Sequence, residues 1–291
     1  MQIHEVLEKA SALLAGCSID TPQLDAGLLL GHCLQKSPTA LYLMARDELD
    51  SSIEEQFFSL LHRRGQREPL AYILGVQEFW SLDFLVTPDV LIPRPETELL
   101  IEEGITAWRE SPGFRGAILD LCTGSGVIAI VLAKELQQPV IAVDLSIDAL
   151  QVARKNAELH GVSHLVSFIQ SDLLSALSCR PYFSLVLSNP PYVSIQELTA
   201  GLQPEVDQYE PHLALDGGDR GMAILRKIHD QLPQRLFPGA NLLMEIGADQ
   251  GDELLAMFAA KEGSPEFFTE FRVKKDYGHH DRIFHAKVNA A

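Results

Sequence analysis

The chain lacks several features that would place it in a specialised class of protein. Its 291 residues include only four cysteines, Cys17, Cys33, Cys122 and Cys179, which are far apart and form no CxxC pair. This spacing disfavours a disulfide framework or a zinc site, and we expect no metal. No apolar stretch approaches the roughly 20 residues that span a bilayer. The first residues also lack a basic region followed by an apolar one, so we expect a cytoplasmic protein with no membrane partner.

Positive charge is also scarce. The chain has 23 Lys and Arg against 40 Asp and Glu, which gives a formal net charge of −17. Proteins that bind nucleic acid mainly through its phosphates need clustered Lys and Arg, and only one short basic cluster is present, at residues 62–67. The charge balance therefore disfavours nucleic acid as the main partner and favours a protein with a basic surface.

Hydrophobic patterning predicts two domains and a connector. Apolar residues recur at helical spacing up to residue 75, where no strand pattern appears, so we expect a helical bundle over residues 1–75. Ser51 and Ser52, followed by Glu54 and Glu55, predict a capping box at its third helix. Residues 77–86 alternate as a β-hairpin would, and a helix is expected near Glu96. We therefore predict a hairpin linker over residues 76–98 and a second domain over residues 99–291.

The second domain has the pattern of an α/β protein. From Ala117 onward, short apolar runs alternate with helical patterns, which is typical of a parallel sheet. Strands are expected at 117–122, 140–144, 166–170, 183–188 and 241–247, with a closing pair at 267–274 and 282–288. Helices are expected at 127–136, 148–160, 222–232 and 252–260.

The motif Asn189-Pro190-Pro191-Tyr192 is the most informative part of the chain. It follows the apolar run 183–188, and two consecutive prolines prevent either a strand or a helix from continuing. Asn189 is therefore held extended at the carboxyl end of a strand, where open α/β sheets bind ligands. Its amide can donate and accept hydrogen bonds, and Tyr192 adds a flat ring with a polar tip. The motif predicts a rigid site for a planar, uncharged group such as an amide or a base edge.

A second motif, Asp120 to Gly126, joins the first strand of this domain to its helix. Gly124 and Gly126 allow a tight turn and a close approach to a ligand, and the helix that follows begins with unpaired N–H groups. Asp144 ends the next strand, about 20 positions after the glycines, where a carboxylate can accept both hydroxyls of a ribose. Asp172, after the third strand, is placed to bound an adenine pocket.

Three interpretations of this second motif remain open from the residues alone. Gly124, Gly126 and Ala129 also satisfy the dinucleotide pattern G-x-G-x-x-A, and the turn could equally be an ordinary strand–helix connection with no ligand. Asp120 favours S-adenosylmethionine, because a carboxylate can meet the cationic methionine end of that molecule. The same carboxylate would repel a pyrophosphate.

Together these segments resemble the class I S-adenosylmethionine-dependent methyltransferases that carry an Asn-Pro-Pro-Tyr motif. That motif alone is shared with DNA adenine and RNA methyltransferases. Residues 92–98, read as Ile-Pro-Arg-Pro-Glu-Thr-Glu, and residues 209–218, read as Tyr-Glu-Pro-His-Leu-Ala-Leu-Asp-Gly-Gly, narrow the match. With them, essentially the whole chain is similar to the release factor glutamine methyltransferases, the PrmC/HemK family. The resemblance implies a Rossmann-like seven-stranded sheet and a small N-terminal helical domain joined to it by a β-hairpin.

The resemblance also implies a reaction and a set of residues. The substrate would be the glutamine of the Gly-Gly-Gln motif in class 1 peptide chain release factors, and the products would be N(5)-methylglutamine and S-adenosylhomocysteine. The N-terminal domain would help to recognise the release factor. The motif positions expected to bind the cofactor are Asp120, Cys122, Thr123, Gly124, Ser125, Gly126, Asp144, Asp172, Leu173 and Asn189. Those expected to bind the glutamine amide are Asn189, Pro190, Pro191 and Tyr192, with Asn189, Pro190 and Tyr192 in the catalytic role.

Two positions depart from the family pattern. Cys122 stands where the family usually has Gly, so its backbone must either keep φ below zero or tolerate strain. Leu173 stands where some relatives place an aromatic residue near the adenine.

Several assignments keep an alternative. A nucleic-acid methyltransferase acting on the exocyclic amine of adenine or guanine is the second candidate activity, and a cofactor-binding protein without catalysis is the third. Arg94 is expected either to pair with Glu96 or Glu98 or to serve the site. Glu245 is expected to be a solvated or capping carboxylate.

Overall fold

The computed structural model describes residues 1–111, 116–259 and 267–290, and the chain divides into two compact units. The first comprises Met1–Val76 and Gln203–Tyr209, and the second comprises Gln77–Leu202 and Glu210–Ala291. Among the described residues, no helix has both the length and the apolar character needed to cross a bilayer.

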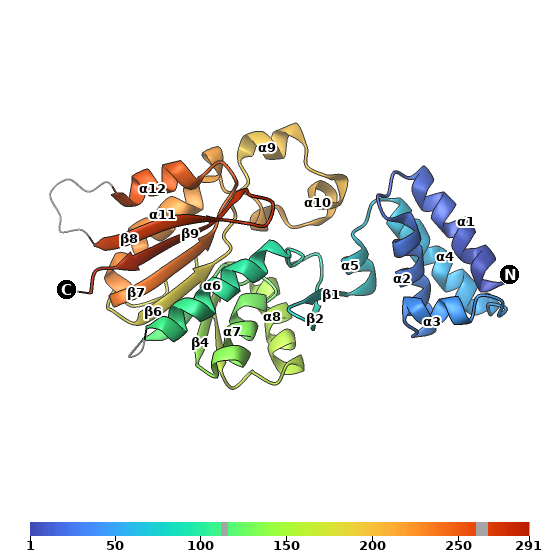
Figure 1. The fold of residues 1–291 in the computed structure, drawn as a ribbon, viewed down its shortest axis with the longest axis horizontal. Helices are drawn as coiled ribbons and strands as arrows, with labels where there is room; N and C mark the ends of the chain where they lie inside the picture. The colour runs from blue at the N-terminus through green and yellow to red at the C-terminus, as the bar shows by residue number, and fades with distance from the viewer. Residues whose placement is uncertain (112–115, 260–266, 291) are drawn as a thin grey trace. The chain divides into compact units, whose positions relative to one another are not determined.

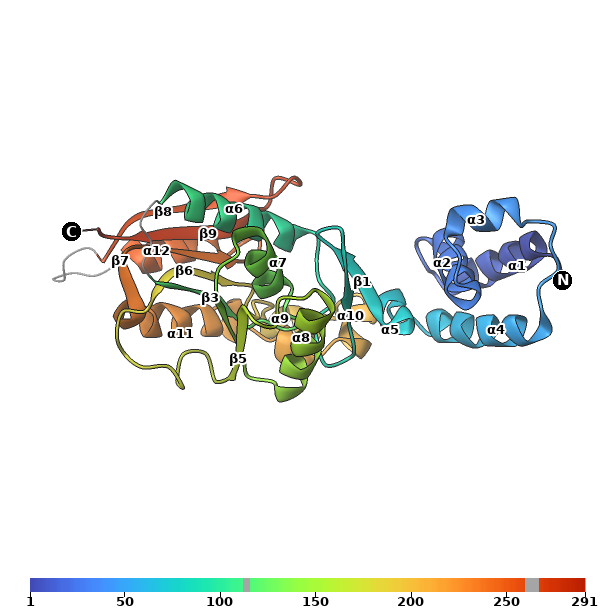
Figure 2. The ribbon, with the colours of Figure 1, turned by 90° about the horizontal axis from the view of Figure 1, so that it is seen from below.

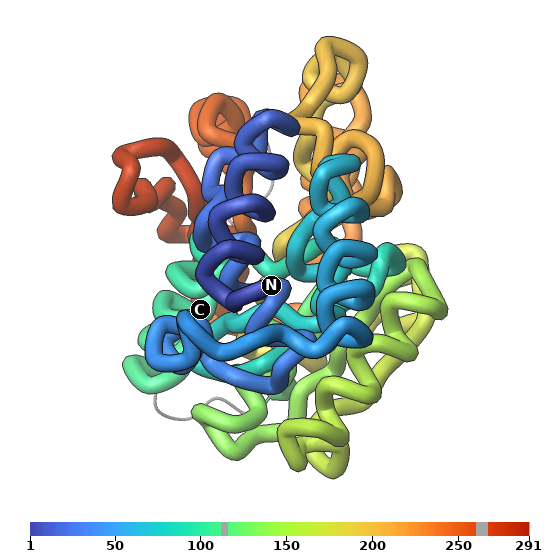
Figure 3. The backbone as a smooth tube through the Cα atoms, turned by 90° about the vertical axis from the view of Figure 1, so that its right-hand side faces the viewer, coloured from blue at the N-terminus to red at the C-terminus, as the bar shows by residue number. Residues whose placement is uncertain are grey.

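The first unit is a small helical bundle. Helix α1 packs against α2, and both contact α4; their backbones are drawn in shades of blue in Figure 3. Their apolar faces meet in one core that includes Val6, Leu29, Leu30 and Phe57. The helices of this unit are α1 (Ile3–Gly16), α2 (Pro22–Leu34), α3 (Pro38–Leu43), α4 (Ser51–Gly65), α5 (Leu70–Leu74) and α10 (Pro204–Tyr209).

The capping box predicted for α4 is wrong. The N-cap is Asp50, one residue earlier, whose carboxylate accepts hydrogen bonds from the backbone N–H and the hydroxyl of Ser52, at 2.8 and 2.6 Å. Asp and Ser are both favourable N-cap residues, so the residue types alone do not choose between adjacent positions.

Residues Gln203–Tyr209 join the first unit although they follow the Asn-Pro-Pro-Tyr motif in the chain. The carboxylate of Glu205 accepts hydrogen bonds from Arg64 at 3.1 Å and Arg67 at 2.6 Å. The hydroxyl of Tyr209 donates to the backbone carbonyl of Gln66 at 2.9 Å. These contacts add α10 to the bundle, which the sequence pattern did not predict.

The second unit is built on a seven-stranded sheet, as predicted (Figure 1). The strand order is β5-β4-β3-β6-β7-β9-β8; the pairs from β5 to β7 are parallel, and β9 is antiparallel to both of its neighbours. All six residues of β6 are buried, as expected for a central strand covered on both faces. The strands are β3 (Ala117–Leu121), β4 (Val140–Asp144), β5 (Val166–Gln170), β6 (Phe183–Ser188), β7 (Leu236–Glu245), β8 (Phe268–Lys275) and β9 (Asp281–Val288).

Helices cover both faces of the sheet. The cluster of α6, α7 and α8 packs on one face, and the cluster of α11 and α12 packs on the other; Figure 2 shows α6 and α11 on opposite sides. The helices are α6 (Glu96–Glu110), α7 (Val127–Leu136), α8 (Ile147–Leu159), α9 (Ile195–Ala200), α11 (Ala223–Gln231) and α12 (Gly251–Ala259). The predicted last residue of α12, Ala260, lies outside the described residues.

The predicted hairpin is formed by β1 (Val76–Phe79) and β2 (Leu82–Leu85). Trp80 and Ser81 form its two-residue turn with φ of 56° and 55°. Positive φ at both positions matches the right-handed twist of the strands, although Gly or Asn is the usual choice. The backbone N–H of Trp80 is anchored to the Glu98 carboxylate at 2.7 Å, and that of Ser81 to Glu78 at 2.7 Å.

Strand β3 lies between β4 on one side and β6 on the other, so the direction of chain winding reverses there. Ligands of open α/β sheets bind beyond the carboxyl ends of the strands at such a switch point. Both predicted motifs follow these strands: residues 122–126 follow β3, and residues 189–192 follow β6.

Candidate active site

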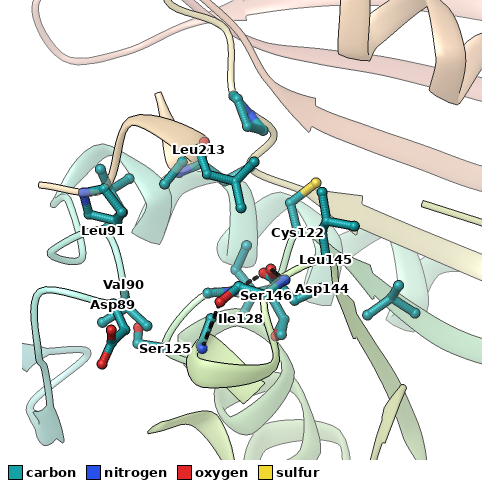
Figure 4. A pocket seen from close by; sticks show the side chains of 18 of the residues that line it. Asp89, Val90, Leu91, Cys122, Ser125, Ile128, Asp144, Leu145, Ser146 and Leu213 are labelled. Atoms are coloured by element: carbon teal, nitrogen blue, oxygen red, sulfur yellow. Dashed lines mark hydrogen bonds between the residues drawn. The ribbon is translucent and has the colours of Figure 1, made fainter. Parts of the chain in front are cut away.

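A cavity of about 300 Å³ lies at the carboxyl ends of β3, β4 and β6 (Figure 4). Its wall combines residues from the two predicted motifs with segments on either side of them in the chain. The predicted site residues on this wall are Cys122, Thr123, Gly124, Ser125, Asp144, Asp172, Leu173, Asn189 and Pro191. The wall also includes Val90, Arg94, Thr97, Ile128, Leu145 and Leu213. The structure therefore brings most of the predicted residues to one place.

The loop after β3 has an unusual backbone. Cys122, Gly124 and Gly126 all have positive φ, of 61°, 54° and 86°. Of the two alternatives posed for Cys122, the structure shows the strained one, because a Cβ in the left-handed region costs about 1–2 kcal/mol. A Cβ at Gly126 would lie 3.0 Å from the Cβ of Ala153 on α8, so that position also needs glycine for packing. Gly124 has no such neighbour and needs glycine only for its φ.

Asp144 ties this loop to the end of β4. Its Oδ2 accepts a hydrogen bond from the backbone N–H of Gly124 at 2.8 Å, and its Oδ1 accepts one from Ser146 at 2.9 Å. Burial raises the pKa of the Asp144 carboxyl, and these N–H groups lower it in part. Each carboxylate oxygen has a second lone pair, so the side chain on the pocket wall can still accept hydrogen bonds from a diol.

Asp120 lies beneath the loop and is not one of the wall residues. It is fully buried, and its Oδ2 accepts hydrogen bonds from the Thr123 hydroxyl at 2.5 Å and the Ala129 N–H at 3.1 Å. Its Oδ1 has no hydrogen-bond partner among the described residues. Burial raises the pKa of Asp120 to about 7. A buried carboxylate oxygen without a donor is costly, so a positive charge in the cavity above the loop would stabilise the ionised form of Asp120.

Two further predicted cofactor residues follow β5. Asp172 is exposed and Leu173 is buried, and both line the cavity. Leu173 has a φ of 49° and also packs with the core beneath α11. Leu173 gives this part of the cavity an apolar wall, which suits the flat face of a base.

The Asn-Pro-Pro-Tyr motif is only partly on the cavity wall. Asn189 and Pro191 line it, whereas Pro190 is buried and Tyr192 points to a different partner. The hydroxyl of Tyr192 donates to Oε1 of Glu245 at 2.9 Å. Burial and the Glu245 carboxylate raise the pKa of Tyr192, so its phenol stays protonated at neutral pH.

Two carboxylates near the site have partners that the sequence did not predict. The expectation that Glu245 is a solvated or capping carboxylate is wrong, because it is 1% exposed and accepts from Thr97 and Tyr192. Of the two alternatives for Arg94, the pair with Glu96 or Glu98 does not form, and a role in the site stays a prediction for a residue that lines the cavity. Arg94 pairs instead with Glu210 at 2.5 Å, and Glu210 also accepts the backbone N–H of Ile92 at 3.2 Å.

Comparison with known proteins identifies the family. Residues 5–75 match the model of the PrmC N-terminal domain, and residues 96–218 match that of the methyltransferase small domain. A release factor glutamine methyltransferase of Geobacter sulfurreducens is 40% identical over 268 residues, 92% of this chain and 91% of the relative. One from Escherichia coli strain K12 is 36% identical and covers 96% of each chain.

The chain belongs to the release factor glutamine methyltransferase family. The resemblance noted in residues 92–98, 189–192 and 209–218 is therefore confirmed. The fold is confirmed as well, because the solved structure of a methyltransferase from Pyrococcus furiosus matches it with a TM-score of 0.51 at 16% identity, over 78% of this chain and 98% of the other.

Membership of this family implies S-adenosylmethionine as the cofactor, and the cavity fits that molecule. Asp144 keeps free acceptor positions for a ribose, and the apolar end near Leu173 suits an adenine. The unpartnered Oδ1 of Asp120 supplies negative charge beneath the glycine loop. These three features lie in the order in which the β5, β4 and β3 loops follow one another across the sheet.

Proposed function

We propose that this protein transfers a methyl group from S-adenosylmethionine to the side-chain amide nitrogen of the glutamine in the Gly-Gly-Gln motif of class 1 peptide chain release factors. Family membership supports the reaction, and the names of the relatives support the substrate. The observation that carries the choice of a substrate with an N–H donor is the orientation of Asn189. Its Nδ2 donates to the Thr97 hydroxyl at 3.1 Å, and no described residue donates to its Oδ1.

The chemistry requires positioning more than activation. S-adenosylmethionine, when bound, supplies a methyl group on a positively charged sulfur, which is a strong electrophile. An amide nitrogen is a poor nucleophile because its lone pair is delocalised into the carbonyl. Holding that nitrogen in line can contribute about 7–11 kcal/mol, so most of the task falls to the residues that orient the amide.

Asn189 and Pro190 are the residues we assign to that task. The Asn189 Oδ1 and the Pro190 carbonyl accept the two amide hydrogens, which directs the nitrogen lone pair into the cavity. Both acceptors also stabilise the positive charge that grows on nitrogen in the transition state. No strong base is needed before transfer, since the proton can leave to solvent afterwards. Tyr192, tied to Glu245, and Pro191 keep the motif rigid.

The remaining predicted residues hold the cofactor in this proposal. Asp144 accepts the ribose hydroxyls, Asp172 and Leu173 bound the adenine, and Asp120 faces the cationic methionine end. The loop of Cys122, Thr123, Gly124, Ser125 and Gly126 lets the backbone approach closely. We further propose that residues 1–75 form a domain that recognises the release factor, that residues 76–98 link it to the catalytic domain, and that the catalytic domain spans residues 99–291.

The second candidate, methylation of an exocyclic amine in RNA or DNA, would use the same kind of rigid site for a planar, uncharged group. The net charge of −17 disfavours it, because phosphate binding needs a basic surface. Methyl transfer to a release factor, to RNA and to DNA should be measured side by side with the wild type and with Asn189→Ala. We expect transfer to the release factor alone and loss of turnover in the variant. Transfer to nucleic acid only would replace the proposal, and cofactor binding without any transfer would favour a non-catalytic protein.

A further inference from the structure

Asn189 is the end of a chain of hydrogen bonds that runs through the protein interior. Its Nδ2 donates to Oγ1 of Thr97 at 3.1 Å, and that hydroxyl donates to Oε2 of Glu245 at 2.7 Å. The other carboxylate oxygen of Glu245 accepts the Tyr192 hydroxyl at 2.9 Å. Thr97 is the second residue of α6 and Glu245 is the last residue of β7, and they are 2% and 1% exposed.

The donor and acceptor chemistry of these groups allows this series of hydrogen bonds to run in one direction only. In the structure both Thr97 and Tyr192 donate to Glu245, which is the arrangement that a carboxylate accepting on both oxygens requires. A hydroxyl has a single hydrogen, so Thr97 can only accept from its other neighbour. The neighbour must then be the NH₂ end of the Asn189 amide rather than its oxygen. Reversing the amide would leave two buried acceptors facing each other, which is costly.

The surroundings of Glu245 bear on its ionisation. Burial raises the pKa of its carboxyl, while the hydrogen bonds from Thr97 and Tyr192 and the positive charge of Arg282 lower it. Glu96 also raises it, and burial is the largest effect, so the pKa of Glu245 lies above its ordinary value. The hydrogen bonds that its two oxygens accept from Thr97 and Tyr192 oppose its protonation.

We propose that Thr97 and Glu245 are positioning residues that hold the Asn189 amide with its Oδ1 toward the cavity. This inference rests on the proposed function, in which Asn189 accepts a hydrogen from the substrate amide. The orientation selects a group that brings an N–H donor, such as the primary amide of glutamine, and rejects a carboxylate. Thr97 lines the cavity, but its hydroxyl is committed to Asn189 and Glu245, so it acts through Asn189.

The test compares Thr97→Val with Thr97→Ser and with Thr106→Val. Valine keeps the shape of threonine without the hydroxyl, and serine keeps the hydroxyl. Thr106 lies on the same helix, where its exposed hydroxyl bonds only the Glu102 carbonyl at 2.9 Å, which makes it a matched control. We expect Thr97→Val to lower kcat on the release factor by about tenfold to a hundredfold, as misorientation of a reacting group does. The KM for S-adenosylmethionine should stay close to wild type, and Thr97→Ser and Thr106→Val should retain the wild-type kcat.

A double-mutant cycle separates positioning from a merely structural role. If Thr97 acts through Asn189, then adding Thr97→Val to Asn189→Ala should change kcat little, because the amide it orients is already gone. A wild-type kcat in Thr97→Val, or the same fold loss with and without the Asn189 side chain, would overturn the proposal. Glu245→Gln tests the chain of hydrogen bonds from its other end, and it replaces Thr97→Val in the test if that variant fails to fold. In this variant the glutamine NH₂ group can donate to the Thr97 hydroxyl, which is then free to donate to Asn189. The Asn189 amide can then turn its oxygen toward Thr97, and we expect the same loss of kcat.

A readout without activity keeps this inference distinct from the proposed function. The side-chain NH₂ of Asn189 can be observed by NMR, and its hydrogens should exchange faster with solvent in Thr97→Val than in wild type or Thr97→Ser. If the wild type transfers no methyl group to a release factor, the proposed function fails. The hydrogen-exchange rate of the Asn189 side chain still shows how its amide is oriented. Unchanged exchange in Thr97→Val would contradict the hydrogen bond itself.

Discussion

Arg94, which lines the cavity, forms an ion pair with the buried Glu210, with Nη2 2.5 Å from a carboxylate oxygen. The pair joins the segment before α6 to the segment that carries Pro211 and Leu213, and both segments line the cavity. Glu210 also accepts the backbone N–H of Ile92. The two segments that narrowed the family resemblance are therefore in direct contact.

Glu210→Gln should loosen this wall of the cavity. Losing a charged partner of Arg94 should lower the free energy of unfolding by about 1–3 kcal/mol, because the guanidinium keeps fewer hydrogen bonds in a partly buried place. The Kd for S-adenosylmethionine should rise as the wall relaxes. Thermal unfolding and calorimetric titration measure the two effects. Glu253→Gln, which breaks exposed pairs with Arg220 and Arg226, is the control and should change stability by about 1 kcal/mol or less. Equal effects of the two variants would argue against a special role for Glu210.

At position 122, glycine should give a more stable protein than alanine, which reverses the usual order of stability. Both Cys122→Ala and Cys122→Gly remove the thiol, but alanine keeps a Cβ at a φ of 61°. We expect the glycine variant to be more stable than the alanine variant by about 1 kcal/mol, since only glycine adopts this backbone without strain. Denaturant unfolding of the pair measures the difference. An alanine variant that is equally stable or more stable would mean that residue 122 is not strained.

Cofactor affinity should depend on the protonation of Asp120. Burial raises its pKa to about 7 in the ligand-free protein, and a cationic ligand favours the carboxylate form. Below that pH a proton must leave on binding, so the Kd for S-adenosylmethionine should rise by up to about tenfold per pH unit as the pH falls below 7. Calorimetry between about pH 7.5 and pH 6 measures the slope. Asp120→Asn should flatten it, and an identical slope in both proteins would remove Asp120 from the cofactor site.

Glu205→Ala tests whether residues 203–209 stabilise the first unit. The change removes the acceptor shared by Arg64 and Arg67 and should lower the stability of that unit by about 1.5–3 kcal/mol. Burial raises the pKa of Glu205, but the hydrogen bonds from its own backbone and from the arginines outweigh this and keep it below its usual range. The stabilisation is therefore present at neutral pH and lost as the pH falls through the lowered pKa. Hydrogen exchange of the unit reports the change, with the exposed Glu55→Ala as control; equal protection in both variants would show that Glu205 contributes nothing.

Much of the second unit could be predicted because its local signals agree with its tertiary structure. The buried run 183–188 becomes β6 with the bounds that the prolines after it indicate, and α7 begins and ends where its pattern does. The strand expected at 241–247 is β7, which begins earlier, at Leu236, and runs through Pro238 and Gly239 to Glu245. Its pairing with β6 is irregular in that stretch, which shows how tertiary contacts override a local breaker.

What could not be predicted depends on contacts between distant parts of the chain. Arg94 and Glu210 are 116 positions apart, and nothing in the spacing of nearby charges distinguishes Glu210 from Glu96 or Glu98. The buried Glu245 accepts a hydrogen bond from Thr97, which is 148 residues away in the chain. Positive φ at Leu173 also has no local signal, because leucine is not a residue that favours it. At position 126, in contrast, the residue is glycine, which favours positive φ, so the sequence does indicate the tight turn there.

The most direct test of the account is to map the added methyl group. A class 1 release factor is incubated with the wild-type protein and S-adenosylmethionine, and its peptides are sequenced by mass spectrometry, with Asn189→Ala in parallel. We predict one methyl group on the side-chain nitrogen of the Gly-Gly-Gln glutamine with the wild type and only a small residual fraction of it with the variant. A methyl group on any other residue, or full methylation by Asn189→Ala, would contradict the assignment of Asn189 and its amide-binding site.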